Sequence, residues 1–499
     1  MEPLTSRLKR VLSSRRGGFA VFVTAFAATL IASGWTTRWS SFGILPPVSP
    51  AVALTTSVPP ILDPRGVSLS GTLSHTKLVQ GEPGNLYLRL ELTAPARDRH
   101  DFVRRPNDIV VVLDRSGSMT EERKLPYAKQ AIRDLLARLG AEDRFALVTF
   151  DDHAMVPVPL TAVSDGARER IGAIVSQIEP GGSTNMGMGL KLASELLTQP
   201  GETRNRRVIL LSDGHANVGI TSTEGLAGLA KSIVDYGAVV STIGMGLGFN
   251  EVLMAQLADH GMGNYAYLEN LATLAQIFAN DLNDARLVFA ERSELTLHLA
   301  DGVGLIDAGG YPIERTPGSN MVRIPIGQMI SGREKVVTVT LTPGTAAIGE
   351  FNLGAVALHY RADGAEHTIS LPSTQLAYAV IESTRRDEAV ASIRGEIFRS
   401  AWVANNLGLM QKAFRQAVVS GDKRQAEQAL ADYEAKLTEA EKSSGVQLTN
   451  DDLKRKLDGM EHELDVAFTG AQDEQRRKQN SFGKAMYSES IANQRDNVQ

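Results

Sequence analysis

The chain has no cysteine among its 499 residues. Disulfide frameworks, thiolate zinc sites, iron–sulfur clusters, cysteine nucleophiles and a cysteine-linked lipid anchor are therefore all excluded. A basic surplus is also missing, because 52 lysine and arginine residues face 57 acidic ones and the formal net charge is −5. Proteins that bind nucleic acid or anionic lipid usually carry such a surplus, so the charge argues against both as general partners.

Motifs for nucleotides and for a serine nucleophile are missing as well. No G-x-x-x-x-G-K-[ST] run occurs, which excludes a P-loop ATPase. Gly244, Gly246 and Gly248 alternate without completing G-x-G-x-x-G, and no G-x-S-x-G elbow is present. We therefore expect no bound nucleotide.

A long uncharged run covers residues 17–37, and its 21 residues match the length of one membrane-spanning helix. Basic residues dominate the segment before it: Arg7, Lys9, Arg10, Arg15 and Arg16, against Glu2 alone. The positive-inside bias predicts that residues 1–40 form a cytoplasmic basic tail and a signal-anchor helix, with the main body periplasmic or extracellular. The alternative is a protein secreted after signal cleavage, for which Ala25-Phe26-Ala27 and Ala51-Val52-Ala53 are candidate sites.

The rest of the chain has ordinary globular composition, with 43% hydrophobic and 22% charged residues. Residues 41–65 contain six prolines and predict an extended linker. Residues 66–96 and 290–380 alternate apolar with polar side chains, as half-buried strands do. Between them, residues 104–285 alternate short apolar runs with helical stretches, which predicts an α/β unit with a doubly wound, mainly parallel sheet. We expect this unit to be inserted in one antiparallel β-sandwich that the flanking strands share.

The C-terminal part, residues 383–475, is predicted to be helical. Apolar residues recur at steps of four and three over residues 426–440 and again over 453–467, with Gly445 between the two stretches. This spacing predicts a helical hairpin. Residues 476–499 are polar and are predicted to be a frayed tail.

Oxygen-bearing side chains stand in loops of the α/β unit, two of which follow expected strands while one precedes an expected helix. They stand in three loops: Asp114-Arg115-Ser116-Gly117-Ser118, Gly181-Gly182-Ser183-Thr184-Asn185 and Ser212-Asp213-Gly214. Loops at the carboxyl ends of parallel strands meet at one edge of the sheet. Two carboxylates and three hydroxyls are a hard-oxygen set that suits Mg²⁺, with Mn²⁺ or Ca²⁺ as alternatives. Because few ligands are charged, a bound cation keeps residual positive charge and attracts an external anion.

This arrangement resembles the von Willebrand factor type A (VWA) domain and its metal-ion-dependent adhesion site (MIDAS), over about residues 106–285. The resemblance implies that Ser116, Ser118 and Thr184 ligate the metal through hydroxyls, and that Asp114 and Asp213 hold it directly or through water. It also implies that an Asp or Glu carboxylate of a protein partner takes the open position. The flanking layout is similar to bacterial relatives of inter-alpha-trypsin inhibitor heavy chains and of calcium-activated chloride channel-like proteins.

We interpret the sequence as an exported, membrane-tethered, metal-dependent binding protein and not as an enzyme. One alternative is an assembly subunit of an ATP-driven chelatase or chaperone, which some type A domains serve. Another is a Mg²⁺-dependent hydrolase. A phosphatase of the haloacid-dehalogenase type would need a second Asp two residues after Asp114, where Ser116 stands.

Overall fold

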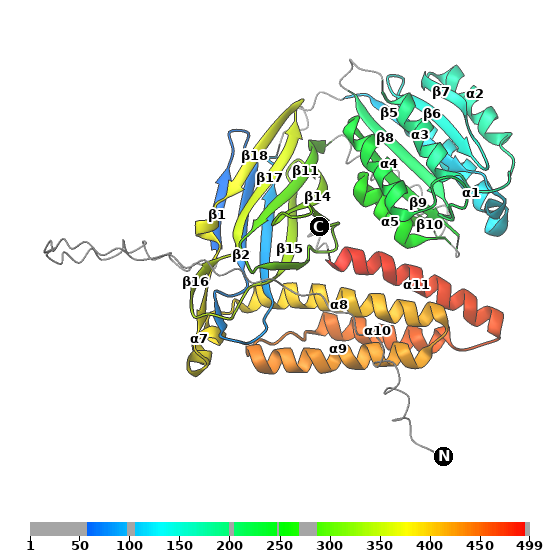
Figure 1. The fold of residues 1–499 in the computed structure, drawn as a ribbon. Helices are drawn as coiled ribbons and strands as arrows, with labels where there is room; N and C mark the ends of the chain where they lie inside the picture. The colour runs from blue at the N-terminus through cyan, green and yellow to red at the C-terminus, as the bar shows by residue number, and fades with distance from the viewer. Residues whose placement is uncertain (1–56, 97–104, 199–203, 247–248, 269–286, 495–499) are drawn as a thin grey trace, which may run out of the picture. The chain divides into compact units, whose positions relative to one another are not determined.

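A computed structural model of the chain describes residues 57–96, 105–198, 204–246, 249–268 and 287–494 (Figure 1). The membrane helix predicted over residues 17–37 lies outside these ranges. Within them, no helix combines the length and apolar composition that crossing a bilayer requires.

The α/β unit contains a six-stranded sheet in the order β10-β9-β8-β5-β6-β7. Its strands are β5 (Asn107–Asp114), β6 (Arg144–Phe150), β7 (Ala154–Ala162), β8 (Asn205–Ser212), β9 (Ala238–Met245) and β10 (Met262–Leu268). Strand β5 pairs in parallel with both β6 and β8, and all eight of its residues are buried. This burial explains why the run Ile109–Leu113 is continuously apolar.

Helices cover both faces of this sheet (Figure 1). They are the 3-10 helix η1 (Gly117–Arg123) and the α-helices α1 (Lys124–Arg138), α2 (Asp165–Ser176), α3 (Met186–Leu196), α4 (Thr223–Asp235) and α5 (Glu251–His260). Val111 of β5 packs in one core with α1 and α2, whereas Val110 packs in the other core with α3, α4 and α5. The predicted doubly wound, mainly parallel sheet is confirmed.

The edge strand β7 is the one antiparallel member of this sheet, and the sequence analysis did not predict it. Its sequence contains Pro157 and Pro159 and has no clear alternation of apolar residues. Proline lacks the N–H that a central strand needs, but an edge strand can direct that position to solvent. The sequence signal is therefore weak although the strand is nine residues long.

Strands before and after the α/β unit form two five-stranded sheets and a small third sheet. The first has the order β1 (Ser57–Leu62), β2 (Ser68–Leu73), β4 (Leu86–Thr93), β15 (Glu334–Thr342), β12 (Gly304–Asp307). The second has the order β13 (Glu314–Arg315), β14 (Met321–Ile330), β11 (Val288–Leu299), β17 (Gly354–Ala362), β18 (Ala365–Leu371). The third has the order β16 (Gly349–Asn352), β19 (Ala377–Ile381), β3 (Lys77–Val79).

The pairing of β4 with β15 joins the two halves of this sandwich across the inserted unit. Leu88 and Leu90 of β4 share a core with Leu295 of β11 and Leu358 of β17. The two five-stranded sheets therefore form the predicted antiparallel sandwich, whereas β3, β16 and β19 lie in a separate sheet in which β3 and β19 pair in parallel.

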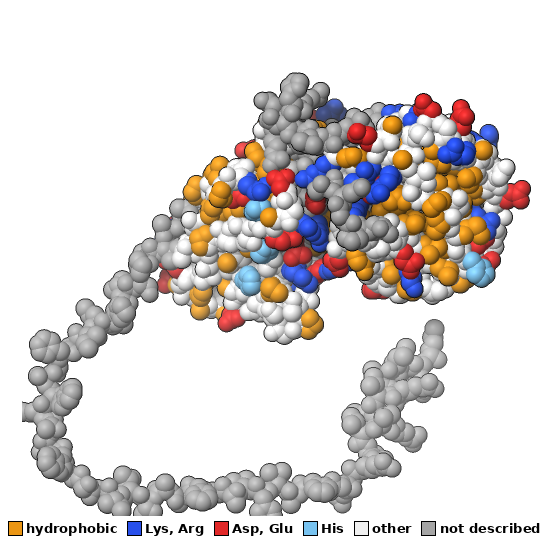
Figure 2. Space-filling view, turned by 90° about the horizontal axis from the view of Figure 1, so that it is seen from above, with side chains coloured by type: hydrophobic (Ala, Val, Ile, Leu, Met, Phe, Trp, Pro, Cys, Tyr) orange, Lys and Arg blue, Asp and Glu red, His pale blue; other side chains and the backbone are white. Residues whose placement is uncertain are grey.

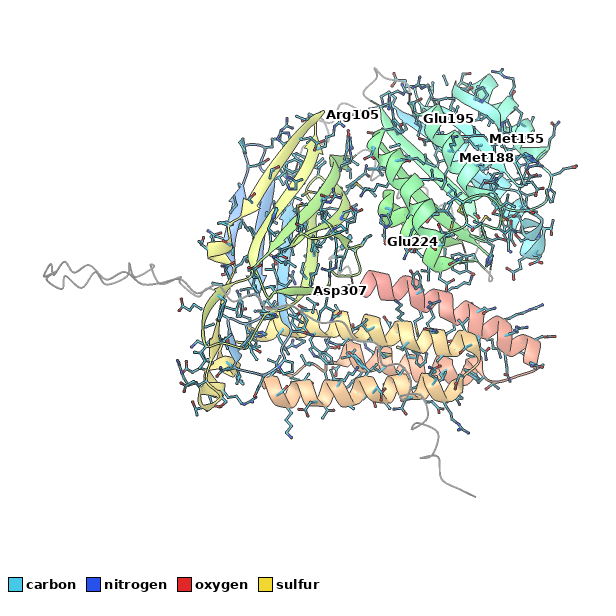
Figure 3. All side chains as sticks on the ribbon, viewed as in Figure 1. Arg105, Met155, Met188, Glu195, Glu224 and Asp307 are labelled. Atoms are coloured by element: carbon cyan, nitrogen blue, oxygen red, sulfur yellow. The ribbon has the colours of Figure 1, made fainter. Side chains whose placement is uncertain are left out.

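An ion pair joins the start of the α/β unit to a strand of the sandwich. Arg105 precedes β5, and its Nη1 lies 2.7 Å from Oε1 of Glu291 on β11, the first described strand after the unit. Figure 3 labels Arg105 at this point. The start of the α/β unit is therefore in direct contact with the sandwich.

The predicted proline-rich linker over residues 41–65 was wrong in its second half. Residues 57–62 form β1, which pairs antiparallel with β2. Pro59 and Pro60 lie between Val58 and Ile61, where the register of the ladder shifts. Since β1 is an edge strand and the prolines occupy its irregularity, they do not interrupt the pairing.

The predicted C-terminal hairpin is part of a larger helical assembly. Short helices η2 (Ser373–Gln375), η3 (Ser383–Arg385) and α7 (Arg386–Ala391) precede α8 (Gly395–Ser420), α9 (Lys423–Ser444), α10 (Asp451–Ala467) and α11 (Gln472–Gln494). The hairpin corresponds to α9 and α10, and Figure 1 shows all four long helices packed together. The polar tail predicted over residues 476–499 was wrong, because residues up to 494 belong to α11.

Helix α11 packs along α8 through a few large side chains. The rings of Phe414 and Phe482 meet edge to face with centroids 5.9 Å apart, and Met486 is buried in the same core. Most other positions of α11 are polar, so its apolar face is too sparse to stand out in the sequence.

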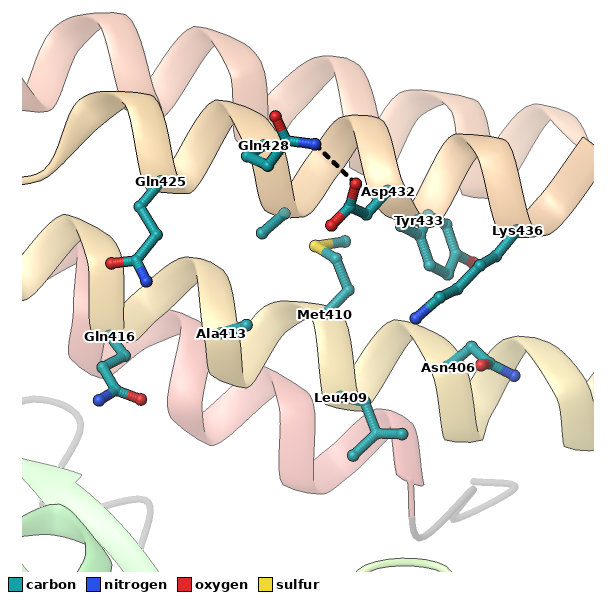
Figure 4. A pocket seen from close by; sticks show the side chains of 11 residues that line it. Asn406, Leu409, Met410, Ala413, Gln416, Gln425, Gln428, Asp432, Tyr433 and Lys436 are labelled. Carbon is teal, nitrogen blue, oxygen red and sulfur yellow. Dashed lines mark hydrogen bonds between the residues drawn. The ribbon is translucent and has the colours of Figure 1, made fainter. Parts of the chain in front are cut away.

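A groove of about 410 Å³ lies between α8 and α9 (Figure 4). Leu409 and Met410 line one side, and Tyr433 lines the other. The Gln428 amide donates a hydrogen bond of 2.7 Å to Asp432 at the rim. The groove marks where the exposed face of α8 begins, since Leu409 is 54% exposed while Phe414 is fully buried.

We expect Phe414→Ala to lower the free energy of unfolding by about 3–5 kcal/mol, because it leaves a cavity where α8 meets α11. Urea unfolding measures this loss, and hydrogen exchange should show faster exchange in α11. Leu409→Ala on the exposed side of the same helix is the control and should change stability by less than about 0.5 kcal/mol. Equal effects of the two substitutions would contradict the packing described above.

Candidate metal centre

Asp114 is the last residue of the central strand β5 and is completely buried. Its Oδ1 accepts a hydrogen bond of 2.9 Å from the backbone N–H of Ser116, and its Oδ2 accepts one of 2.6 Å from the hydroxyl of Ser212. Burial raises the pKa of Asp114 to about 6, and the neighbouring Asp213 carboxylate adds to this rise while the hydrogen bonds oppose it. The carboxylate is thus held in a fixed orientation away from water.

Ser116 and Ser118 follow in the turn that leads into η1. Ser116 is 1% exposed, and its Oγ lies 3.2 Å from Oγ of Ser118. Neither hydroxyl caps the N-terminus of η1, because no side-chain cap bond forms there. The pair therefore presents two adjacent hydroxyl oxygens beside Asp114.

Thr184 comes from the loop before α3 and is almost completely buried. Two backbone bonds attach this loop to the first one: Gly117 N–H donates to Gly182 O at 2.8 Å, and Gly181 N–H donates to Arg115 O at 2.6 Å. The backbone N–H of Thr184 donates to Oδ1 of Asn217 at 2.8 Å. Thr184 is thus fixed on the loop that adjoins Ser116 and Ser118.

Asp213 follows β8 and is also completely buried. Its Oδ2 lies 3.3 Å from Nζ of Lys124, whereas its Oδ1 has no hydrogen-bond partner. A buried carboxylate oxygen without a partner is costly, because it has lost its hydration without compensation. A cation bound at this oxygen would remove that cost.

The structure brings the predicted residues together to different degrees. Asp114 is hydrogen-bonded to Ser116, whose hydroxyl lies beside that of Ser118. Asp213 interacts electrostatically with Asp114 and is joined to Ser118 through Lys124. Thr184 is held beside these residues by the backbone bonds of its loop. Among the described residues, no group of three or more His, Asp and Glu side chains gathers to hold a metal. A cation in this centre would therefore depend on hydroxyl oxygens beside two carboxylates, as the hard-oxygen prediction requires. The donors present fit Mg²⁺ or a similar ion.

Four supporting residues were missed by sequence reasoning. Ser212 orients Asp114, Asn217 holds Thr184, and Asp151 lies 2.5 Å from the guanidinium of Arg115. Lys124 was not singled out in the sequence at all. The position of Ser212 next to Asp213 could have suggested its role, but the contact of Lys124 with Asp213 joins residues 89 positions apart.

Residues 108–280 match the family model described as the von Willebrand factor type A domain. This segment is a von Willebrand factor type A domain. The VWA match covers the sheet and all three loops of the metal centre.

Several known proteins are similar to the chain. YfbK of Escherichia coli (strain K12) is 29% identical over 205 residues, which are 40% of this chain and 35% of YfbK. Protein sll0103 of Synechocystis sp. is 27% identical over 59% of this chain and 70% of its own length. The matched region thus spans about a third of the first relative and most of the second. Two further relatives belong to the families named from the layout. Inter-alpha-trypsin inhibitor heavy chain H4 of Sus scrofa is 28% identical over 34% of this chain and 17% of its own length. Calcium-activated chloride channel regulator 1 of Bos taurus is 28% identical over 31% of this chain and 17% of its own length.

Among solved structures, the von Willebrand factor type A protein from Catenulispora acidiphila has a TM-score of 0.57. It is 18% identical and covers 74% of this chain and 87% of its own. At this identity the likeness establishes the fold alone.

The C-terminal helices contact the VWA domain on the loop between β9 and α5. Lys484 of α11 is 4% exposed, and its ammonium donates to the carbonyl oxygens of Gly246 and Phe249 at 3.2 and 3.4 Å. The same ammonium lies 3.7 Å from the centroid of the Phe249 ring. Arg415 of α8 forms an ion pair with Glu251 at the start of α5. Helices α8 and α11 are therefore docked beside the metal centre.

Burial lowers the pKa of Lys484 to about 7, although the two carbonyls and the ring face stabilise its charged form. In the unfolded chain the amine keeps a pKa near 10.5, so the unfolded state binds more protons between these values. Stability contributed by Lys484 should therefore rise as the pH increases from 6 to 9.

We expect the melting temperature of the wild type, measured relative to Lys484→Met, to increase across this pH range. Thermal unfolding of both proteins at pH 6 and 9 measures the difference. Lys478→Met serves as the control, because Lys478 pairs with Glu474 at the surface of the same helix. A wild-type advantage that stays constant with pH would refute the titration of Lys484.

Proposed function

We propose that the VWA domain binds Mg²⁺, or Mn²⁺ or Ca²⁺, and through it captures an Asp or Glu side chain of a protein partner. The observation that carries this proposal is the buried Oδ1 of Asp213, which lacks a hydrogen-bond partner. The other oxygen of this carboxylate is linked through the Lys124 ammonium to the backbone carbonyl of Ser118 in the β5–η1 turn. Ser116, Ser118 and Thr184 would supply hydroxyl ligands, and Asp114 and Asp213 would supply the negative charge.

The low charge of this ligand set supports anion capture. When bound, a divalent cation supplies a positive coordination position that an external carboxylate can occupy. Hydroxyl ligands add no charge, so Asp114 and Asp213 are the only anionic groups among the five proposed ligands. The protein's own residues thereby hold the ion without saturating its attraction for a carboxylate.

Exposed apolar side chains around the loops support a macromolecular partner. Met155, Met188 and Ile220 are 49%, 42% and 43% exposed. Met188 is four residues after Thr184, and an added Cβ on its neighbour Gly187 would lie 3.3 Å from Cβ of Ile220. Figure 3 labels Met155 and Met188 on β7 and α3. Figure 2, which views the molecule from above, shows that other apolar side chains are exposed as well. Such side chains beside a charged centre are typical of protein interfaces.

The similarity to inter-alpha-trypsin inhibitor heavy chains and to chloride channel regulators supports a binding role over catalysis. The residues agree with it, because Ser116 stands where a phosphatase of the haloacid-dehalogenase type would need its second Asp. We therefore propose that the protein is not an enzyme.

Ser116→Ala and Asp213→Asn should each lower the affinity for Mg²⁺ by about tenfold or more, since each removes one proposed ligand. Calorimetric titration of Mg²⁺ and Mn²⁺ into the purified protein measures the affinity. Thr120→Ala is the matched control, because its hydroxyl lies in the same turn but bonds to Gly117 O. Equal heats from the wild type and both variants would refute the metal centre.

We further propose that residues 17–37 anchor the protein in the membrane and that everything after residue 40 is exported. The support is the uncharged run and the basic residues before it. The competing role, an assembly subunit of a chelatase or chaperone, places the same domain in the cytoplasm.

Protease added to intact cells with a permeabilised outer envelope should therefore digest the VWA domain. An antibody to the C-terminal helices of the chain detects this digestion as loss of the full-length band. A cytoplasmic protein of the same cells must remain intact as the control. A VWA domain that is protected until the cells are lysed would favour the cytoplasmic role. Mass spectrometry of the N-terminus would distinguish an uncleaved anchor from a cleaved signal.

A further inference from the structure

Lys124 is a buried cation inside the metal centre. It is the first residue of α1 and is only 5% exposed. Its ammonium donates to the carbonyl oxygen of Ser118 at 3.2 Å and lies 3.3 Å from Oδ2 of Asp213. It therefore contacts the backbone of one proposed ligand and the carboxylate of another.

The surrounding backbone is shaped to keep the lysine there. Gly246 lies against its side chain, and a Cβ at this position would come within 2.2 Å of Cε of Lys124. Gly246 also has a φ of 78°, which a glycine adopts without strain. The aliphatic part of the Lys124 side chain thus packs against Gly246 in the β9–α5 loop, and its ammonium reaches Asp213.

The two oxygens of Asp213 have different surroundings. Oδ2 is paired with the ammonium, whereas Oδ1 is buried without a partner. One oxygen is thus neutralised from within the protein, and the other is left for a cation. A metal at Oδ1 and the ammonium at Oδ2 would share one carboxylate.

We propose that Lys124 is a positioning residue that serves as the internal counter-cation of Asp213. It holds this carboxylate in place when no metal is bound, and it adds positive charge to the centre when a metal is bound. This inference rests on the proposed function.

The charges of the centre give the expected direction. Asp114, Asp213 and Lys124 together carry a net charge of −1, and a divalent cation would change it to +1. Without the lysine, the loaded centre would be neutral. Lys124 should therefore weaken metal binding and strengthen the attraction of the loaded centre for a carboxylate.

Other charges near the centre stay the same in this comparison. Lys484 interacts electrostatically with Glu122, Lys124 and Asp213, so a second buried cation lies in the same neighbourhood. Its contacts are with the Gly246 and Phe249 carbonyls and not with Asp213. Removing Lys124 thus removes the charge that contacts the metal centre directly.

Lys124→Met tests the proposal, because methionine has a similar length and no charge. Calorimetric titration with Mn²⁺ alone should give a dissociation constant about tenfold lower than that of the wild type. Acetate, used as a carboxylate probe, should bind the Mn²⁺-loaded variant several-fold more weakly than the loaded wild type. Lys129→Met is the matched control, since Lys129 lies on the same helix and bonds to Ser176 O.

If Lys124 only stabilised the fold, Lys124→Met would disturb the centre and lower its affinity for Mn²⁺, which is the opposite of the expected change. Unchanged or weaker Mn²⁺ binding by Lys124→Met, with a wild type that binds Mn²⁺, would overturn the inference and leave the proposed function intact. A wild type that binds no Mn²⁺ would instead overturn the proposed function.

The ion pair itself can be tested without metal. In EDTA, Lys124→Met should lower the melting temperature, since Asp213 then loses its partner. Combining it with Asp213→Asn should cost less than the two single changes added together, because both remove the same interaction. Additive losses would show that Lys124 does not pair with Asp213, and would overturn its role as a counter-cation even if Mn²⁺ binds.

Discussion

Two carboxylates are buried close together at the carboxyl edge of a parallel sheet, and the surrounding loops are arranged around this constraint. Strands β5 and β8 pair in parallel with Leu113 opposite Leu211, so Asp114 and Asp213 emerge at nearly the same level. Each would be unstable alone in this environment. The Asp114 carboxylate accepts hydrogen bonds from the Ser212 hydroxyl and the Ser116 backbone N–H. The Asp213 carboxylate has a partner at one oxygen only, where Oδ2 pairs with Lys124. The remaining oxygen is the position at which we propose that a cation binds.

The meeting of most of the proposed ligands at one edge could be predicted because Asp114, Ser116 and Ser118 follow β5 and Asp213 follows β8, and the burial of both strands is visible in the sequence. Ile109–Leu113 and Val208–Leu211 are continuous apolar runs, and the polar residues after them had to meet at one edge. Lys124 could not be predicted in this way. Its contact with Asp213 depends on how α1 is set against the sheet, and no local pattern encodes that geometry. The apolar spacing of α1 showed only that a helix was present.

The errors in the fold have a common physical origin. Strands β1 and β7 contain prolines that central strands would exclude, and both lie at sheet edges where proline is tolerated. Helix α11 is mostly polar because a few side chains, Phe482 and Met486 among them, are enough to dock it on α8. Sequence patterns report the average burial of a segment. Segments at the periphery bury only part of their surface, as β1 and β7 do, and are therefore the least visible.

Because the VWA domain is inserted in the sandwich, it is tethered at both ends. The ion pair between Arg105 and Glu291 joins the start of the domain to β11, and β4 and β11 on either side of the insertion belong to the same hydrophobic core. A pulling force on a ligand held at the metal centre would be divided between two anchored connections, whereas a domain on a single linker would carry it on one. The same double attachment limits rotation, so the sandwich would also fix the direction in which the binding edge faces.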